Sequence, residues 1–265
     1  MIERAIKITD ANDPRIADYV SIRERDLIRD HQTFICEGKT VLQVLARQAH
    51  FSIKSLLILQ NRLDGVADIV KSIEHNIPVY TANRNTMDAI AGFPMHRGIL
   101  ATATKKDAPA PKMDAGPIVV ASAIANHDNM GALFRNAAAF GAQAVLLDAQ
   151  CCDPLYRKAI RVSVGGVLEV PFRHGGHIDA IIKELAENGF SIAALATNGS
   201  IELANWKPGA QVALLVGSEG TGLPTEVLMR VTTLRIPMHG EFDSLNVATA
   251  AAIALHHLHA NSERP

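Results

Sequence analysis

The chain has 265 residues, of which 26 are Lys or Arg and 27 are Asp or Glu, so its formal net charge is −1. Hydrophobic residues make up 48%, charged residues 20%, and the mean hydropathy is +0.11. These values exclude a disordered chain and a uniformly basic nucleic-acid coat, although a local basic patch stays open. The length suits one large domain or two modest ones, with enough residues to bury a core.

Three cysteines, Cys36, Cys151 and Cys152, form no disulfide framework and no CxxC pair, which fits a reducing compartment. The first residues carry charges throughout and lack the apolar segment of a secretory signal. No apolar run approaches the length needed to span a bilayer. We therefore expect a cytoplasmic protein that does not enter a membrane.

Residues 1–104 are expected to form a small α/β domain. Residues 1–33 are dense in charge and predict an outer helix, after which short apolar runs alternate with segments of helical spacing. The predicted strands are 34–38, 55–59, 78–82 and 98–104, and the predicted helices are 40–49, 65–76 and a short one near 87–90.

A proline-rich segment, KKDAPAPKMDAGP at residues 105–117, follows this domain. Its prolines deny a helix and it has no apolar period, so it predicts a linker; a long surface loop within one domain is the alternative. Because both flanks look able to form a core, we favour a linker between residues 1–104 and 118–265.

Residues 118–265 alternate more sharply between apolar strands and helical patterns. The predicted strands are 117–124, 144–148, 168–172, 191–197, 212–217 and 233–238; the predicted helices contain 131–140, begin at Asp153-Pro154, cover 178–188 and run from about 244 to 259. Asn129 and Ser244 are candidate N-caps, and Gly141 and Gly189 are candidate helix ends. Continuous apolar strands separated by helices predict a mostly parallel sheet that is covered on both faces.

Four polar loops follow predicted strands, at 126–131, 197–199, 217–222 and 238–246. Ligands of open α/β sheets bind at the carboxyl ends of the strands, so these loops are the candidate site. The glycines at 217, 220 and 222 do not match G-x-G-x-x-G, and the chain has neither a P-loop nor a G-x-S-x-G elbow. These glycines permit positive φ and close backbone approach to a ligand, or they form an ordinary turn.

Two charged side chains stand out in these loops and their helices. Glu219 lies between glycines, where a buried carboxylate would need a partner. Arg135 lies in a helix of small and apolar residues whose start is near Asn129, and helix starts and arginine forks both suit phosphate. From this stretch alone, a solvent-facing arginine paired with Asp128 is the commoner explanation.

The final helix offers one polar candidate. Ser244 is expected to cap it, so Asn246 in its first turn has no capping need and points towards function. His256, His257 and His259 share this helix without a metal-binding pattern, and no metal site is expected. Adjacent Cys151 and Cys152 are expected to be buried as small hydrophobes.

Three segments, NHDNMGALFRNAAAFGA, LLVGSEGTGLP and RIPMHGEFDSLNVATAAAIAL, resemble in order and spacing the three motifs of the SpoU/TrmH-type RNA ribose 2′-O-methyltransferases of the SPOUT superfamily. YRKAIRVSVGGVLEVPF resembles the helix and strand that connect the first two motifs. FICEG, SLLIL and PMHRGILA resemble, less specifically, the substrate-binding domain that many members carry. The resemblance covers roughly residues 30–260.

The resemblance implies a SPOUT catalytic domain at 118–265, preceded by an RNA substrate-binding domain at 1–104. The C-terminal segment of such a domain passes through a loop as a deep trefoil knot, a rare feature in proteins. S-adenosylmethionine would bind in the knot, and two subunits would pair beside it through this domain. By motif position, backbone groups of Gly217, Ile236 and Leu245 would hold the cofactor, and Thr197 would line the same pocket.

Also by motif position, the polar active-site set would be Asn129, Arg135, Glu219, Ser244 and Asn246. The implied reaction is attack of a ribose 2′-hydroxyl, in rRNA or tRNA, on the sulfonium methyl, which requires alignment and deprotonation. Because a guanidinium normally stays protonated, Arg135 is expected to hold the RNA phosphate and polarise the hydroxyl. Asn129 and Asn246 would orient the hydroxyl or the ribose, and Glu219 would pair with Arg135 or a nearby donor.

Two residues depart from the family pattern: Phe134 stands where aliphatic residues are usual, and Asn136 where threonine is frequent. Neither departure removes a polar position of the site.

An RNA-binding or ribosome-assembly factor that keeps cofactor binding without turnover is the alternative, and the intact polar set argues against it. The missing phosphate-binding glycine patterns argue against an unrelated nucleotide-dependent enzyme. RNA is the expected partner, with no role for DNA or a membrane.

Overall fold

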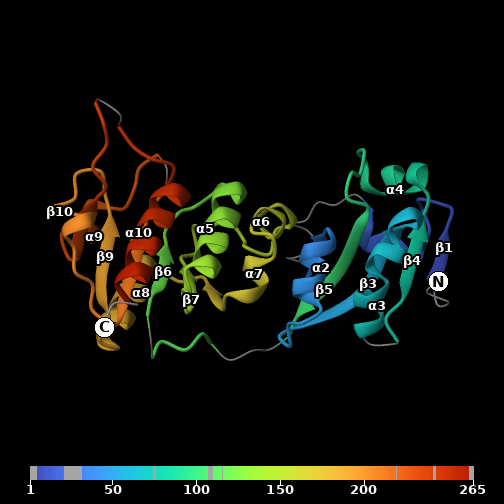
Figure 1. Ribbon diagram of the computed structural model, residues 1–265, viewed down its shortest axis with the longest axis horizontal. Helices are drawn as coiled ribbons and strands as arrows, with labels where there is room; N and C mark the ends of the chain where they lie inside the picture. The colour runs from blue at the N-terminus through green and yellow to red at the C-terminus, as the bar shows by residue number, and fades with distance from the viewer. Residues whose placement is uncertain are drawn as a thin grey trace. The chain divides into compact units, whose positions relative to one another are not determined.

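The computed structural model describes residues 5–20, 32–73, 76–106, 110–114, 116–218, 220–240 and 243–262 (Figure 1). The chain divides into two compact units. The first contains Met1–Ala108 and Leu155–Leu168, and the second contains Pro109–Pro154 and Glu169–Pro265. Within the described residues, no helix combines the length and the apolar character needed to cross a bilayer.

The first unit is built on a five-stranded mixed sheet of order β1-β4-β3-β5-β2. The first three strands of that order are parallel, whereas β5 runs antiparallel to both of its neighbours. The strands are β1 (Ala5–Ile8), β2 (Thr33–Glu37), β3 (Phe51–Leu59), β4 (Val79–Ala82) and β5 (Ile99–Lys105). The helices are η1 (Pro14–Tyr19), α2 (Lys39–Leu45), η2 (Gln60–Arg62), η3 (Asp64–Val66), α3 (Ala67–Ser72), α4 (Arg84–Ala91), α6 (Arg157–Val162) and α7 (Gly166–Glu169).

The start of the chain differs from the expected outer helix. Residues 5–8 form a strand that pairs with β4, and Pro14–Tyr19 is a 3₁₀ helix. Tertiary burial explains the difference: Ile16 and Tyr19 are fully buried, and the Tyr19 hydroxyl lies 2.8 Å from Ser55 Oγ. The charged run at residues 23–30, on which the helix prediction mainly rested, lies outside the described residues.

The second unit is built on a seven-stranded sheet of order β10-β12-β9-β11-β6-β7-β8, and every pairing in it is parallel. The strands are β6 (Ile118–Ala121), β7 (Ala144–Leu147), β8 (Phe172–His174), β9 (Ser191–Leu195), β10 (Ile201–Glu202), β11 (Val212–Val216) and β12 (Thr232–Arg235). The helices are α5 (His127–Ala139), α8 (Ile178–Glu187), η4 (Leu203–Asn205), α9 (Thr225–Leu228) and α10 (Val247–Ser262). The predicted parallel sheet is confirmed.

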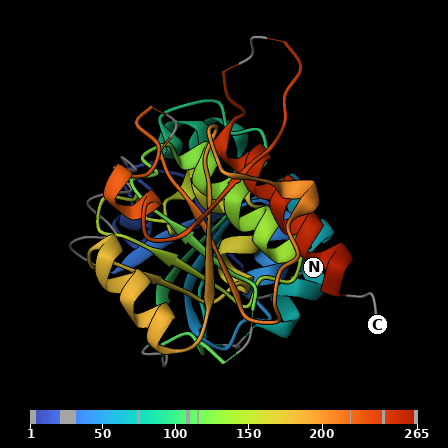
Figure 2. The same cartoon turned by 90° about the vertical axis from the view of Figure 1, so that its left-hand side faces the viewer.

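Helices cover both faces of this sheet. Figure 2 shows α5 and α10 on one side of the strands and α8 and α9 on the other. On the α8 side, Ile181 and Leu185 pack in one cluster with Ile118 and Val120 of β6. The apolar residues of α8 recur at the three- and four-residue spacing of one helix face, which explains why it docks there.

Three element boundaries differ from the sequence prediction. The helix expected from Asp153-Pro154 begins at Arg157, and the final helix begins at Val247. The strand expected at 168–172 is displaced, because Leu168 and Glu169 belong to the helical turn α7 and Pro171 has no N–H for the ladder. The strand β8 therefore starts at Phe172.

Candidate active site

The loops that follow β9, β11 and β12 line a cavity of about 380 Å³ at the carboxyl ends of these parallel strands. This is the edge at which open α/β sheets bind ligands, and the volume lies in the range of small-molecule sites. The four residues expected to hold a cofactor, Thr197, Gly217, Ile236 and Leu245, all line the cavity, and so does Ser244.

The loop after β11 folds tightly onto itself. A Cβ on Gly217 would lie 2.5 Å from the carbonyl carbon of Gly222 and from the backbone nitrogen of Leu223. Gly222 has a φ of +66°, and Ser218 Oγ lies 2.9 Å from Thr221 Oγ1. The sequence predicted a close approach of Gly217 to a ligand. In the structure Gly217 approaches the backbone of its own loop, and this contact sets the shape of the cavity wall. Glu219 lies outside the described residues.

The loop after β9, which carries Thr197, is fixed against β12. A Cβ on Gly199 would lie 2.4 Å from the carbonyl carbon of Leu234, so only glycine fits there without a backbone shift. Arg235 donates from Nη1 to the Gly199 carbonyl at 2.9 Å and from Nη2 to Glu202 Oε1 at 2.7 Å. The arginine fork thus holds this wall of the cavity in place.

Two of the predicted polar residues meet beside the cavity. Asn246 Nδ2 donates a hydrogen bond of 2.8 Å to Asn129 Oδ1, which joins residues 117 positions apart. Asn129 is 9% exposed. Leu245 and Val247, the neighbours of Asn246, both line the cavity. The first and third motif segments therefore converge at the cavity edge.

The helix caps differ from the sequence prediction. Asn126, not Asn129, caps α5, because its side chain accepts from the backbone N–H of Asp128 and the helix begins at His127. Asn246, not Ser244, caps α10, because its Oδ1 accepts from the N–H groups of residues 248 and 249 at 2.9 and 3.3 Å. Asn246 therefore does have a capping role, contrary to the sequence prediction, and its amide serves both α10 and Asn129.

Arg135 lies apart from the two asparagines. It is six residues along α5 from Asn129, which corresponds to about 9 Å along the axis and about 120° around it. Its side chain is exposed, as in the commoner explanation from the sequence, but it makes no hydrogen bond or ion pair with another described residue, Asp128 included. An exposed guanidinium on this helix is available to a ligand that arrives from solvent.

Two polar residues near the site were not among the site residues predicted from the sequence. Asn136, almost two turns from Asn129 on the same face of α5, donates from Nδ2 to the Ala248 carbonyl at 2.8 Å and so fixes α10 to α5. Buried Asp148 accepts from Ser122 Oγ at 2.5 Å and from the Ala123 N–H at 3.1 Å. It thereby anchors the loop from β6 to α5. The sequence does offer an indication of this role, because Asp148 is an acidic residue that directly follows an apolar strand.

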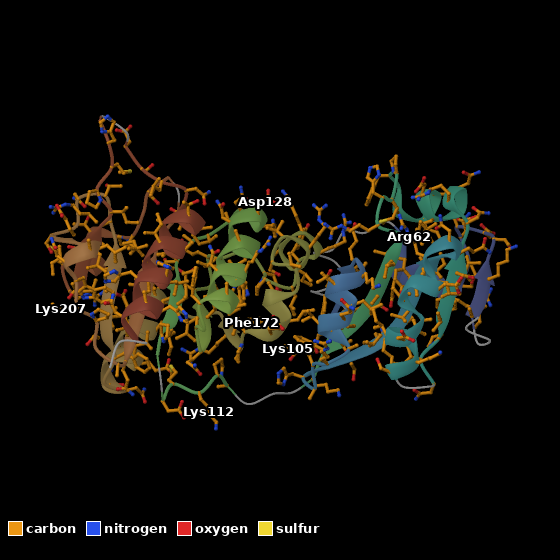
Figure 3. All side chains as sticks on the ribbon, viewed as in Figure 1. Arg62, Lys105, Lys112, Asp128, Phe172 and Lys207 are labelled. Carbon is orange, nitrogen blue, oxygen red and sulfur yellow. The ribbon has the colours of Figure 1, made fainter. Side chains whose placement is uncertain are left out.

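The aromatic departure from the family pattern has a packing explanation. Phe134 is fully buried, and its ring meets that of Phe172 edge to face, with centroids 5.6 Å apart at 87°. Figure 3 labels Phe172 on β8 and Asp128 at the start of α5, where the polar loop from β6 enters the helix. The bulky residue next to Arg135 therefore belongs to the core and leaves the exposed face of α5 unchanged.

Of the adjacent cysteines that were expected to be buried, Cys151 is buried and Cys152 is partly buried. Burial raises the pKa of the Cys151 thiol to about 12 and that of Cys36 still further, so neither forms a thiolate at neutral pH. The described part of the chain holds no group of three His, Cys, Asp or Glu side chains that could bind a metal ion. The polar groups that line the described cavity are amides, hydroxyls, backbone groups and the carboxylate of Asp243.

Comparisons with known proteins identify the class of enzyme. Residues 116–256 match the SpoU rRNA Methylase family, and residues 37–109 match the RNA 2′-O ribose methyltransferase substrate-binding family. A tRNA/rRNA methyltransferase of Mycobacterium tuberculosis, itself uncharacterized, is 34% identical over 262 residues, covering 94% of this chain and 90% of the relative. The 23S rRNA (guanosine(2553)-2′-O)-methyltransferase RlmP of Bacillus subtilis is 24% identical, covering 95% and 98%.

Solved structures agree in fold. The S-adenosylmethionine-bound rRNA methyltransferase of Sinorhizobium meliloti superimposes with a TM-score of 0.82 at 23% identity, covering 99% of this chain and 100% of that chain. An RNA 2′-O ribose methyltransferase gives a TM-score of 0.81 at 25% identity, covering 97% and 99%. The chain is thus an RNA methyltransferase that uses S-adenosylmethionine and acts on a ribose 2′-hydroxyl. It belongs to the SpoU rRNA Methylase family.

The cavity lining fits S-adenosylmethionine. Apolar side chains such as Leu195, Leu234 and Ile236 offer surface for a purine, and the folded loop at 217–222 offers backbone groups at close range. The described lining includes the carboxylate of Asp243 and contains no lysine or arginine. A cationic sulfonium would therefore meet no like charge there.

Proposed function

We propose that methyl transfer takes place at the cavity edge where Asn129 and Asn246 meet. The hydrogen bond between these two side chains carries the proposal, because it joins the first motif to the cavity formed by the others. When bound, S-adenosylmethionine supplies a methyl group that is attached to a sulfonium sulfur. Loss of this methyl group leaves a neutral thioether. The residues of the chain then have to align a ribose 2′-hydroxyl, whose proton would pass to solvent water.

In our proposal, different residues bind the cofactor and orient the ribose. Backbone groups of Gly217, Ile236 and Leu245 hold the cofactor, with Thr197 on the facing wall. Asn129 orients the ribose hydroxyl, and Asn246 fixes the Asn129 amide while it caps α10.

Ser244, which lines the cavity, offers a hydroxyl to the ribose. Glu219 pairs with Arg135 or another donor. Arg135 holds an RNA phosphate and polarises the hydroxyl; its exposure supports a contact with RNA, since phosphate must approach from solvent.

We also propose the wider arrangement of the molecule. Residues 1–104 bind substrate RNA, 105–117 link the domains, and 118–265 catalyse transfer; the two family matches, which meet between residues 109 and 116, support this division. The segment after β12 passes through the loop after β11 as a trefoil knot, supported by the joint lining of one cavity. Two copies pair through the C-terminal domain, where Ile253 of α10 is 40% exposed. The substrate is rRNA or tRNA in the cytoplasm.

Single-turnover transfer from labelled S-adenosylmethionine to unmodified ribosomal and transfer RNA tests the proposal, together with a calorimetric cofactor titration. Asn129→Ala should lower the transfer rate by about two to three orders of magnitude and leave cofactor affinity nearly unchanged. Asn188→Ala, a change at the exposed end of α8, is the matched control. Cofactor binding without transfer by the unaltered chain would favour an assembly factor, and a normal rate for Asn129→Ala would refute the assigned role.

A further inference from the structure

A second pocket lies within the first unit and shares no lining residue with the cavity just described. It is lined by Glu37, Phe93, Pro94, His96, Arg97, Arg157 and Arg161. Three segments supply these residues: the end of β2, the connection from α4 to β5, and α6, which groups with this unit. None of these residues takes part in the proposed methyl transfer.

The pocket carries an excess of positive charge. Glu37 is 5% exposed, and its Oε2 accepts from Arg157 Nη1 at 2.8 Å, so this pair is neutral. Arg97 and Arg161 make no ion pair with any described residue. Two uncompensated guanidinium groups beside a third repel one another, and an anion bound between them would relieve that repulsion.

The position of Arg97 is constrained by its surroundings. Its side chain runs against Gly38, where an added Cβ would lie 3.2 Å from both Arg97 Cδ and Nη1. Gly38 has a φ of +102°, so the backbone turn there favours glycine for a second reason. Because the stem of Arg97 packs closely, its guanidinium loses less freedom on binding than that of a fully solvated arginine.

An exposed aromatic ring completes the pocket. Phe93 is 39% exposed, and the guanidinium carbon of Arg157 lies 5.1 Å from its ring centroid. The exposed proline at 94 continues the apolar surface. Proteins that bind single-stranded nucleic acid combine an aromatic surface, on which a base stacks, with guanidinium groups that bind a phosphate. The pocket therefore combines an apolar surface with its positive charges.

We propose that this pocket binds an unpaired nucleotide of the substrate RNA, with a backbone phosphate on Arg97 and Arg161 and a base on the apolar surface of Phe93. The nucleotide must be unpaired, because a base is free to stack on a side chain only where it has left the helix. The inference rests on the proposed function in taking RNA as the ligand. It adds a contact that recognises single-stranded RNA rather than a duplex.

Fluorescence anisotropy with a single-stranded RNA of about twelve nucleotides, and with a duplex of equal length, tests the proposal over a series of salt concentrations. Arg97→Gln with Arg161→Gln should weaken single-strand binding and reduce the slope of log affinity against log salt by about 0.7, the contribution of the one phosphate contact that these two residues share. Phe93→Ala should weaken binding by about fivefold to hundredfold, as expected for one lost stacking contact, with an unchanged slope. Arg47→Gln, in the turn after α2 and outside the pocket, is the matched control and should bind like the unaltered chain.

The outcomes separate this proposal from the proposed function. Single-strand affinity equal to that of the unaltered chain in both pocket variants would overturn it, while cofactor-dependent methyl transfer by the unaltered chain would leave the function standing. If the variants lose duplex affinity as much as single-strand affinity, the bound nucleotide need not be unpaired and that part of the proposal is wrong. If they bind RNA normally but lose affinity for a phosphorylated peptide, the pocket binds a protein partner instead. Unchanged cofactor affinity and circular dichroism in the variants would establish that they fold.

Discussion

Replacing Asn246 with alanine is expected to destabilise the second unit by about 2 kcal/mol. The side chain accepts from two N–H groups at the start of α10, and loss of such a cap costs about 1 kcal/mol. It also donates to Asn129, which is 9% exposed, and a lost hydrogen bond at such a site costs about another 1 kcal/mol. Asn246→Asp keeps an acceptor for the cap, so it should recover about half of the loss.

Trp206 provides the assay, because it is the only tryptophan of the chain and lies in the second unit. Its ring stacks on that of His257 in α10, with centroids 6.3 Å apart at 19°, and its carbonyl lies 2.9 Å from His257 Nε2. Urea unfolding followed by its fluorescence therefore reports whether α10 is docked.

A double-mutant cycle with Asn129→Ala isolates the link between the two asparagines. We expect a coupling free energy of about 0.5 to 1.5 kcal/mol, because the residues share a direct hydrogen bond. A coupling indistinguishable from zero, or an Asn246→Ala variant that unfolds at the midpoint of the unaltered chain, would refute the reasoning.

Three further predictions follow from the same geometry. Gly217→Ala should abolish cofactor binding and destabilise the unit by about 1–3 kcal/mol, because its Cβ would meet the loop backbone; Gly220→Ala, with open space around it, should titrate normally in the calorimeter. Arg135→Lys should lower single-turnover transfer by about two to three orders of magnitude with unchanged cofactor affinity, since lysine keeps the charge but not the planar fork; near-normal transfer would mean that charge alone suffices. A hydrogen bond from Arg173 lowers the pKa of Glu184 in the folded protein. Glu184→Gln should therefore lower the free energy of unfolding above the unfolded pKa of about 4, and this stability difference should disappear as pH falls through the folded pKa. A stability difference that persists in acid would assign Glu184 a different role.

The sequence by itself determined the class of fold and the segments of the site. Apolar strands alternating with helical patterns require a parallel sheet, and the carboxyl ends of such strands meet at one edge. The polar loops after β9, β11 and β12 could therefore be assigned to one site before their contacts were known. Thr197, Gly217, Ile236, Ser244 and Leu245 do line one cavity.

Tertiary structure decided which side chains cap, pair and face solvent. Ser244 and Asn246 are both good caps by residue type, and the start of α10 at Val247 selects Asn246. Its bond to Asn129 links segments 117 residues apart, a distance that no local pattern encodes. The sequence favoured a solvent-facing Arg135 paired with Asp128, whereas the tertiary structure leaves Arg135 exposed without that pair. Local chemistry thus fixed the candidates, and long-range packing chose among them.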